Sequence, residues 1–313
     1  MAGHLPHGRT ARRLEWPFLP PYLRDVVARQ CGSPVVDAVS QTAGFTPGFA
    51  SVLTCADGSR HFVKAASVKA QRMFAESYRE EARKLGSLPA AAPAPRLLWS
   101  HDDDEWVVLG IEHVEARAPA RPWVQADLDA ALAMLVEVST LFTPAPTELS
   151  LDTAATEFAA WPATWQQLRS SRPGLAAHVD EAAALAARLA EASAGDTLCH
   201  TDVRDDNILL TDDGRALLCD WNWPVRGAAW LDALFLLIGP RGDGLDVSPV
   251  IDTHPLFAGV PPDHVDVVLA AATGYFLTSS DLPVPRTSPY VREAQAWQGA
   301  VCWDWLAERR GWQ

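Results

Sequence analysis

The chain has 313 residues, of which 48% are hydrophobic, and a formal net charge of -13 at pH 7. This composition can bury a large core, which excludes a disordered chain, and the length suits two lobes of one catalytic unit or two modest domains. The negative charge argues against nucleic acid or an anionic membrane surface as the main partner.

The cysteines and the apolar runs predict a cytoplasmic protein. We expect a monomer or a dimer. The five cysteines form no C-x-x-C pair, so we expect reduced thiols and no structural zinc site. The apolar runs fall short of the roughly 18 residues that a membrane span needs. Residues 1–13 are basic and polar, and we interpret them as a loose tail and not as a signal peptide.

The first elements predicted are a helix and three strands. Pro20 and Pro21 fit the first turn of a helix that runs to about Gln30. Strand-like segments follow at residues 35–42, 49–55 and 61–66, and the turn residues 56–58 join the last two as a hairpin.

A glycine-containing turn separates the first two strands. Gly44 and Gly48 flank Phe45, Thr46 and Pro47. Two glycines around a turn allow backbone N–H groups to approach phosphates, although a plain hairpin turn fits the same letters. We expect this turn to bind a nucleotide, with Gly44, Thr46, Gly48 and the following Ser51 in contact with it.

Lysine is rare in this chain, and one lysine lies in an apolar strand. Only Lys64, Lys69 and Lys84 occur, against 23 arginines. Lys64 is flanked by Val63 and Ala65, where a charge is costly unless it is paired. The alternative is an ammonium group that reaches solvent from an edge strand.

The next predicted helix, residues 68–88, offers a partner for Lys64. Phe74, Tyr78, Glu81 and Leu85 recur at intervals of four, three and four, so Glu81 lies on the apolar stripe. A carboxylate on that stripe needs a cation, and we predict a Lys64–Glu81 ion pair. Glu76 is the alternative partner.

Residues 96–100 and 106–114 complete a predicted sheet of about five strands, and the rest of the chain is predicted to be mainly helical. The second part has helical spacing and Pro or Gly boundaries. The predicted helices span residues 124–142, 153–169, 175–194, 228–238, 263–278 and 290–309.

The stretch from Leu198 to Trp223 carries the most specific pattern in the chain. His200, Asp202 and Asn207 form H-x-D-x-x-x-x-N, followed by a predicted hairpin that ends at Asp220. Such a hairpin allows Asn207 and Asp220 to share one cation through oxygen ligands, while Asp202 stays free to accept a proton. These groups together are typical of phosphoryl transfer.

This stretch resembles the catalytic loop and the metal-binding aspartate of the aminoglycoside phosphotransferase family, relatives of the protein kinases. Thr201 and Asp206 replace the glycines that are commoner in the family at those two places. The resemblance implies an α+β, bilobal protein-kinase-like fold. Its N-lobe would span residues 1–114, with a small antiparallel sheet and one long helix, and its helical C-lobe would span residues 115–313.

The resemblance also implies roles for individual residues. Asp202 would orient and deprotonate an acceptor hydroxyl, and Asn207 and Asp220 would bind Mg²⁺. ATP or GTP would lie on Lys64, with its adenine edge at Glu112 and Val114. His200 and Asp232 would support the loop, although Asp232 could instead cap its helix.

The implied acceptor is a small hydroxylated molecule, such as an aminoglycoside, another antibiotic or an amino alcohol. Asp205 and Asp206 would help to hold a cationic acceptor, or they are exposed loop charges. Two other hypotheses stay open. One is a catalytically silent nucleotide-binding scaffold, and the other is a metallohydrolase with His200, Asp202 and Asp206 as ligands.

Overall fold

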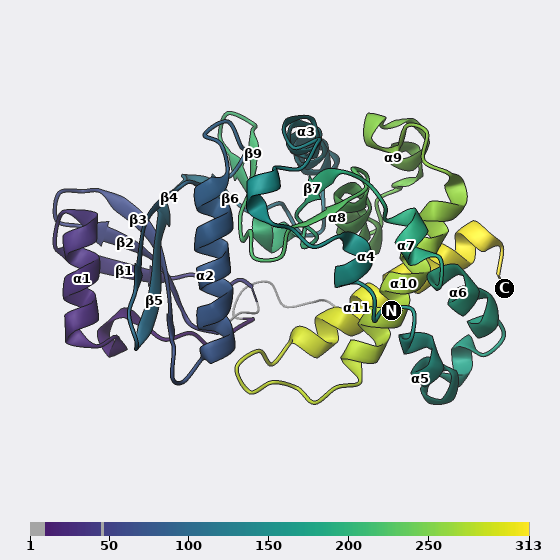
Figure 1. Cartoon of the computed structure of the whole chain (residues 1–313), viewed down its shortest axis with the longest axis horizontal. Helices are drawn as coiled ribbons and strands as arrows, with labels where there is room; N and C mark the ends of the chain where they lie inside the picture. Colours follow the sequence, from purple (N-terminus) through teal and green to yellow (C-terminus); the bar gives the residue numbers. More distant parts are fainter. Residues whose placement is uncertain (1–9, 45–46, 313) are drawn as a thin grey trace.

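The computed structural model describes residues 10–44 and 47–312, which form two parts along the longest axis of the molecule (Figure 1). A five-stranded sheet with two helices lies at one end, and a larger, mainly helical part lies at the other. The predicted α+β architecture with two unequal lobes is therefore confirmed. Thr46, one of the predicted nucleotide contacts, lies outside the described residues.

The sheet is antiparallel, with the strand order β1-β2-β3-β5-β4. All five strands were predicted, and the hairpin between β2 and β3 places Ala50 opposite Lys64. The strands are β1 (Val35–Ser40), β2 (Phe49–Cys55), β3 (Arg60–Ser67), β4 (Leu97–Asp102) and β5 (Trp106–Glu112).

Each face of this sheet is covered by one helix. On one face, Leu23 and Val27 of α1 (Pro21–Cys31) pack against Phe49, Leu53 and Val63. On the other face, α2 (Arg72–Ser87) turns its buried stripe toward β3 and β5. Because side chains alternate along a strand, neighbouring residues of β2 and β3 point to different helices.

The segment 10–14, which we call the N-terminal strap, is bound to the body of the molecule. Its backbone N–H groups donate to the carbonyls of Thr42, Gly48 and Thr287, and the Thr10 hydroxyl donates to the Gly44 carbonyl at 2.5 Å. The expectation of a loose tail is therefore wrong for residues 10–13. A polar segment without periodicity still orders here because its backbone groups find partners.

The helical part contains α9 (Ser248–Thr253), which the sequence did not predict, and two predicted helices are broken. Residues 153–169 and 175–194 each form two short helices instead of one. Pro162 lies in the first break, where it lacks the N–H that a continuous helix needs. The helices are α3 (Gln125–Leu141), α4 (Ala154–Glu157), α5 (Thr164–Ser171), α6 (Val179–Ala186), α7 (Leu189–Ala192), α8 (Leu231–Gly242), α9 (Ser248–Thr253), α10 (Pro262–Ser280) and α11 (Val291–Arg310).

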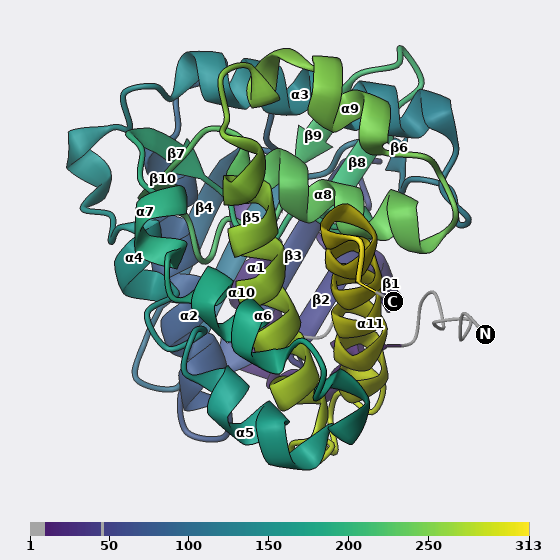
Figure 2. The same ribbon diagram turned by 90° about the vertical axis from the view of Figure 1, so that its right-hand side faces the viewer.

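Helices α10 and α11 lie side by side along the helical part (Figure 2). Gly299 of α11 allows the close approach, since a Cβ atom there would lie 2.6 Å from the Leu277 side chain of α10. Among the described residues, no helix is both long enough and apolar enough to cross a membrane. Short 3-10 helices add turns at Trp16–Phe18, Thr147–Leu149, Pro173–Leu175, Asp205–Asn207 and Pro255–Phe257.

Two small sheets carry the H-x-D-x-x-x-x-N stretch. The strand β7 (Thr197–Cys199) pairs with β10 (Val225–Gly227), and the predicted hairpin is formed by β8 (Ile208–Thr211) and β9 (Ala216–Leu218), with β6 (Ala116–Arg117) beside β8. The loop with Asp202 and Asn207 therefore starts from one small sheet and ends in the other. Asp220 follows β9, as the sequence predicted.

Replacing Gly195 with alanine tests how this stretch is anchored. A Cβ atom at Gly195 would lie 2.4 Å from the Gly227 carbonyl oxygen and 2.5 Å from the Ala228 Cα, and backbone atoms cannot move aside cheaply. We expect Gly195→Ala to lower the free energy of unfolding by about 2 kcal/mol in a urea titration. In the control Gly174→Ala, where nothing lies within 4 Å, the change should stay below about 1 kcal/mol. Equal effects would contradict the close approach.

Candidate active site

The ammonium group of Lys64 joins the two parts of the molecule. Its Nζ donates to Glu81 Oε1 at 2.8 Å and Oε2 at 3.0 Å, and to Asp220 Oδ1 at 2.6 Å. Glu81 is on α2, whereas Asp220 follows β9 in the other part. The predicted Lys64–Glu81 pair is present, and Glu76 pairs instead with Arg72 on the surface.

Burial makes these charges depend on one another. The side chains of Lys64 and Glu81 are 11% and 1% exposed. Burial alone would lower the pKa of Lys64, but the carboxylates of Asp220 and Glu81 outweigh it and raise the pKa. Burial raises the pKa of Glu81, and Lys64 opposes that rise. Lys64 therefore stays charged between two carboxylates.

Asp232 holds the start of the H-x-D-x-x-x-x-N loop. Its carboxylate accepts the backbone N–H groups of His200 at 2.7 Å and Thr201 at 2.8 Å. Thr201 has a φ of 68°, so the chain turns sharply where these two bonds form. Asp232 is 4% exposed and lies inside α8, and Trp230 occupies the N-cap position. The loop-support geometry is therefore present and the capping alternative is wrong.

His200 uses both ring nitrogens within the fold. Nδ1 accepts the Asp202 N–H at 3.3 Å, so Nε2 carries the proton and donates to the Cys219 carbonyl at 3.0 Å. Burial lowers the pKa of His200, which keeps the ring neutral. A ring with both nitrogens engaged cannot bind a metal, so this geometry contradicts the metallohydrolase hypothesis.

Asp202 and Asn207 are locked together. The Asn207 amide donates to the Asp202 backbone carbonyl at 2.9 Å and to Asp202 Oδ2 at 3.0 Å. Arg204 lies 3.3 Å from the other carboxylate oxygen. Burial raises the pKa of Asp202, partly opposed by Arg204. With its side chain 36% exposed, Asp202 remains within reach of a molecule in the cleft.

The side chains of Asp220 and Asn222 are hydrogen-bonded to each other. Asp220 has a φ of 69°, and its Oδ1 accepts both Lys64 and the Asn222 amide, the latter at 2.8 Å. Asn222 is 4% exposed, and its Oδ1 is buried without a hydrogen-bond partner in the described chain. Carboxylate and amide oxygens suit a hard cation such as Mg²⁺, and an unpartnered buried oxygen fits one.

Asn222 is a candidate that sequence reasoning missed. The chain has only two asparagines, and both lie in this one stretch. The presence of both asparagines in this stretch is the sequence signal that could have identified Asn222.

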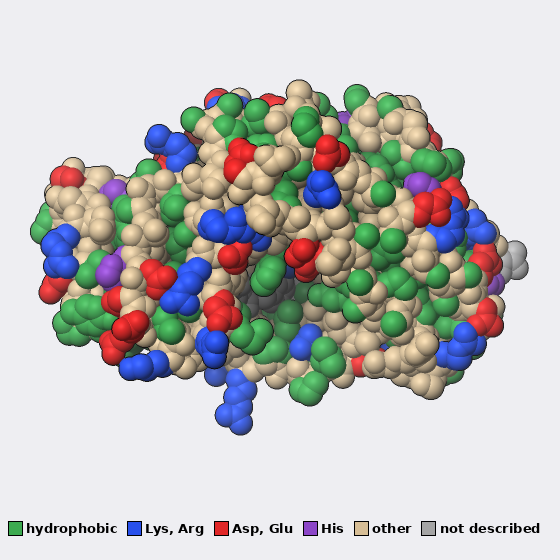
Figure 3. Space-filling view, in the orientation of Figure 1, with side chains coloured by type: hydrophobic (Ala, Val, Ile, Leu, Met, Phe, Trp, Pro, Cys, Tyr) green, Lys and Arg blue, Asp and Glu red, His purple; other side chains and the backbone are tan. Residues whose placement is uncertain are grey.

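The cleft around these groups has a volume of about 350 Å³. Figure 3 shows the surface hollowed between the sheet side and the helical side of the molecule. The cleft is lined by Gly44, Lys64, Glu81, Glu112, Val114, Asp202, Asn207 and Asp220 among others. These predicted site residues, distant in the sequence, therefore share one cavity.

Two predicted nucleotide contacts lie elsewhere. Ala50 and Val52 line the cleft, so Ser51 between them points to the opposite face, toward α1. The prediction for Ser51 is wrong because strand side chains alternate. Gly48 is not among the lining residues either. Its carbonyl accepts the Leu14 N–H, and a Cβ there would lie 3.1 Å from the Ala65 carbonyl oxygen.

The N-terminal strap contributes a cleft residue that the sequence did not suggest. Arg13 lines the cleft, where its Nη2 donates to the Ala43 carbonyl at 2.7 Å. Gly44 makes room with a φ of 82°, since a Cβ there would lie 3.3 Å from Arg13 Nη2. Burial lowers the pKa of Arg13, while Tyr78, Asp220 and Asp206 oppose that change. Its Nε is buried without a partner among the described residues.

A second cavity of about 350 Å³ adjoins the cleft. Gly44, Arg204 and Asp206 line both spaces. Asp206 pairs with Arg204 at 3.0 Å, and Asp205 pairs with Arg121 at 3.1 Å. Neither acid is an exposed loop charge, and both are matched by an arginine. The remaining walls are rich in aromatic side chains, namely Trp123, Phe235, Tyr290 and Trp297.

The chain matches the model of the phosphotransferase enzyme family over residues 56–250, which is more than half of its length. It therefore belongs to that family and is a phosphotransferase enzyme. The resemblance to aminoglycoside phosphotransferases is confirmed.

Solved structures share the fold at low sequence identity. A thermostable mutant of aminoglycoside phosphotransferase APH(4)-Ia, bound to ADP and hygromycin B, is 16% identical with a TM-score of 0.63, covering 92% of this chain and 98% of that chain. Spectinomycin phosphotransferase APH(9)-Ia, bound to ADP and spectinomycin, is 10% identical with a TM-score of 0.63 and the same coverage. The type I macrolide 2'-phosphotransferase is 15% identical with a TM-score of 0.54, covering 88% and 95%. Among curated proteins, no sequence matches significantly.

The buried neutral His200 predicts a specific pH dependence of stability. The unfolded chain binds a proton at this histidine near pH 6.5, whereas the folded chain resists it, so acidification favours unfolding. In His200→Gln this contribution disappears. Between pH 6.5 and 5.5 its free energy of unfolding should fall less steeply than that of the wild type, by up to about 1.4 kcal/mol per pH unit.

Urea titrations across this pH range measure the effect. His101→Gln, a change at a histidine on β4, serves as the control for the removal of a histidine outside the loop. The same slope in His200→Gln and the wild type would contradict a neutral His200.

Proposed function

We propose that this phosphotransferase moves the γ-phosphoryl group of ATP or GTP to a hydroxyl group of a small molecule, an antibiotic or another natural product. One observation carries the proposal. Lys64 bridges Glu81 from one lobe and Asp220 from the other, in the cleft that the locked Asp202–Asn207 pair also lines. Phosphoryl transfer depends mostly on such positioning and on charge neutralisation.

The nucleotide would lie in the cleft with its base against the chain segment after β5. There the Glu112 carbonyl and the Val114 N–H would pair with the adenine edge. Lys64 and Arg13 would hold the phosphates, and Glu81 would orient Lys64. With the base bound at Glu112 and Val114, the chain would divide at this point into an N-lobe of residues 1–114 and a C-lobe of residues 115–313.

Asn207, Asp220 and Asn222 would hold Mg²⁺, which neutralises phosphate charge when bound. Asp202 accepts the proton of the acceptor hydroxyl. Asn207 fixes the carboxylate through Oδ2, and Asp232 fixes the loop backbone. Burial raises the pKa of Asp202, which makes its carboxylate a better proton acceptor.

The acceptor would occupy the second cavity. Its acids are already paired with arginines and its walls are aromatic, so the cavity favours an acceptor with an apolar ring system over a bare polycation. Relatives with this fold include proteins bound to hygromycin B and spectinomycin, and a macrolide phosphotransferase. The candidate acceptors therefore comprise hydroxylated macrolide-like compounds as well as aminoglycosides.

A panel of hydroxylated antibiotics and amino alcohols tests the proposal. Nucleotide consumption is measured for each acceptor, and the product is examined for the mass of one added phosphoryl group. We expect acceptor-dependent release of ADP or GDP with at least one compound. Nucleotide binding without acceptor-dependent turnover across the panel would favour a catalytically silent scaffold.

Asp202→Asn separates chemistry from binding. The change keeps the shape of the side chain but removes the proton acceptor. In single-turnover assays we expect the rate of phosphoryl transfer to fall by about 10² to 10⁴, with the nucleotide Kd changed by less than about threefold. The control is Asp104→Asn, at an exposed turn residue. Unchanged turnover in Asp202→Asn would remove this residue from its role.

Arg13→Gln tests whether the N-terminal strap binds phosphate. A hydrogen bond to a charged group is worth about 1.5–3 kcal/mol, so the Kd for ADP and ATP should rise by about tenfold or more. The Kd for adenosine should not change, since adenosine lacks phosphates. Arg12→Gln is the matched control, because Arg12 is exposed and makes its strap contact through the backbone N–H.

Isothermal titration with the three ligands measures these affinities. Tighter nucleotide binding in Arg13→Gln would mean that Arg13 obstructs the cleft. Equal weakening for adenosine and ADP would mean that the substitution only loosens the strap.

A further inference from the structure

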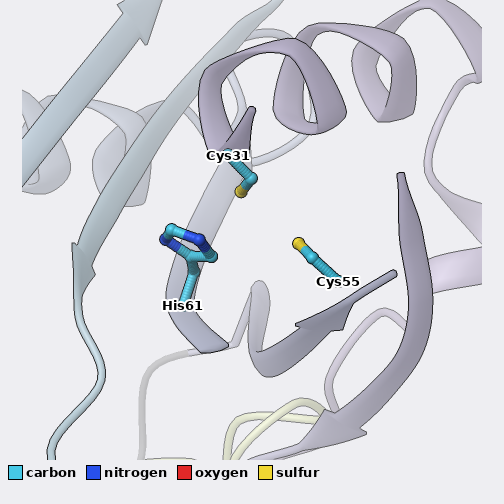
Figure 4. Close-up of side chains that lie close together, drawn as sticks. All are labelled: Cys31, Cys55 and His61. Carbon is cyan, nitrogen blue, oxygen red and sulfur yellow. The ribbon is translucent and has the colours of Figure 1, made fainter. Parts of the chain in front are cut away.

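Two cysteines and a histidine meet on the α1 face of the sheet, away from the cleft. Cys31 ends α1, Cys55 ends β2 and His61 lies near the start of β3. Their candidate ligand atoms all lie within 4.8 Å of one another, and the three side chains point toward a common space (Figure 4). Sequence analysis did not suggest this site because the residues do not form a C-x-x-C pair.

His61 is already oriented as a ligand. The Ser59 hydroxyl donates to Asp57 Oδ1 at 2.7 Å, so its oxygen accepts the proton on His61 Nε2 at 3.2 Å. That tautomer leaves Nδ1 with a lone pair, and Nδ1 is buried without a hydrogen-bond partner in the described chain. A carboxylate that acts through a second group on a ligating histidine is a common support for bound metal ions.

The charges of the cluster also suit a divalent cation. Two thiolates and one neutral imidazole carry two negative charges, which a divalent ion neutralises in this largely buried place. Without an ion, burial raises the pKa of Cys31 to about 12, with a further contribution from Cys55.

The geometry requires only a small contraction. Zinc–sulfur bonds of about 2.3 Å and zinc–nitrogen bonds of about 2.1 Å place tetrahedral ligand atoms roughly 3.5–3.8 Å apart. The present separations are at most 4.8 Å, so the ligand atoms would need to move closer by about 1 Å to bind one ion. Cys31 is 9% exposed and His61 is half-buried, which leaves an entry path from solvent.

We propose that Cys31, Cys55 and His61 form a binding site for a thiophilic divalent cation such as Zn²⁺, with water as the fourth ligand. The ion ties the C-terminal end of α1 to the hairpin between β2 and β3. Lys64 lies on the opposite face of the sheet, since it pairs with Ala50 and lines the cleft. The ion therefore stabilises the small lobe without contacting the nucleotide site.

Zinc binding to the reduced full-length chain tests the site. Competition with a chromophoric chelator should give one Zn²⁺ per chain and a higher Tm. Binding should weaken by about 100-fold or more in Cys55→Ser and in His61→Gln. In Ser59→Ala, which removes only the support of His61, it should weaken by about tenfold. The controls Cys302→Ala and His101→Gln should bind as the wild type does.

Alkylation of the wild-type chain gives a readout that needs no variant. Zinc should protect two of the five cysteines, identified by peptide mass as Cys31 and Cys55. In the cobalt-loaded protein, thiolate-to-metal absorption should appear and should disappear in Cys55→Ser. Three results would overturn the proposal: no zinc uptake, uptake unchanged in both ligand variants, or protection of other cysteines.

Discussion

The position of Lys64 between the buried Glu81 and the partly exposed Asp220 is the constraint on which the rest of the structure depends. One cation faces Glu81 at 2.8 Å and Asp220 at 2.6 Å, so the cleft keeps an excess of negative charge when both acids are ionised. Removing one partner from such a group leaves an uncompensated buried charge. Arg13 reduces that excess from the side of the strap, and a bound cation on Asn207, Asp220 and Asn222 would reduce it further.

The helical lobe fixes the geometry that the charges need. Asp232 accepts hydrogen bonds from two backbone N–H groups of the loop. The neutral His200, at the start of the loop, donates to the Cys219 carbonyl. Asp232 and His200 are buried and do not line the cleft, so they hold the backbone near Asp202 and Asp220 without occupying the site. Such rigid support is what preorganised phosphoryl transfer requires, because most of its catalysis comes from placement.

The sequence predicted the residues whose chemistry conflicts with their local surroundings. Glu81 on an apolar helix stripe implied Lys64, and the spacing of His200, Asp202 and Asn207 marked the loop. The prediction for Ser51 was wrong, although the alternation of side chains along β2 could have corrected it. If Lys64 faces the cleft, its pairing partner Ala50 faces the cleft too, and the next residue, Ser51, points away. Arg13 was missed for another reason. Its contacts reach across 30 residues to Ala43, and nothing in a polar segment without periodicity predicts such a tertiary contact.

Nucleotide affinity in a double-mutant cycle of Lys64→Met and Glu81→Gln tests the central claim most directly. If Glu81 acts only by orienting Lys64, then Glu81→Gln should weaken binding in the wild-type background and change it little once Lys64 is gone. The expected coupling energy is about 0.5–3 kcal/mol. Additive effects, or unchanged nucleotide affinity in Lys64→Met, would contradict a site built around this ammonium group.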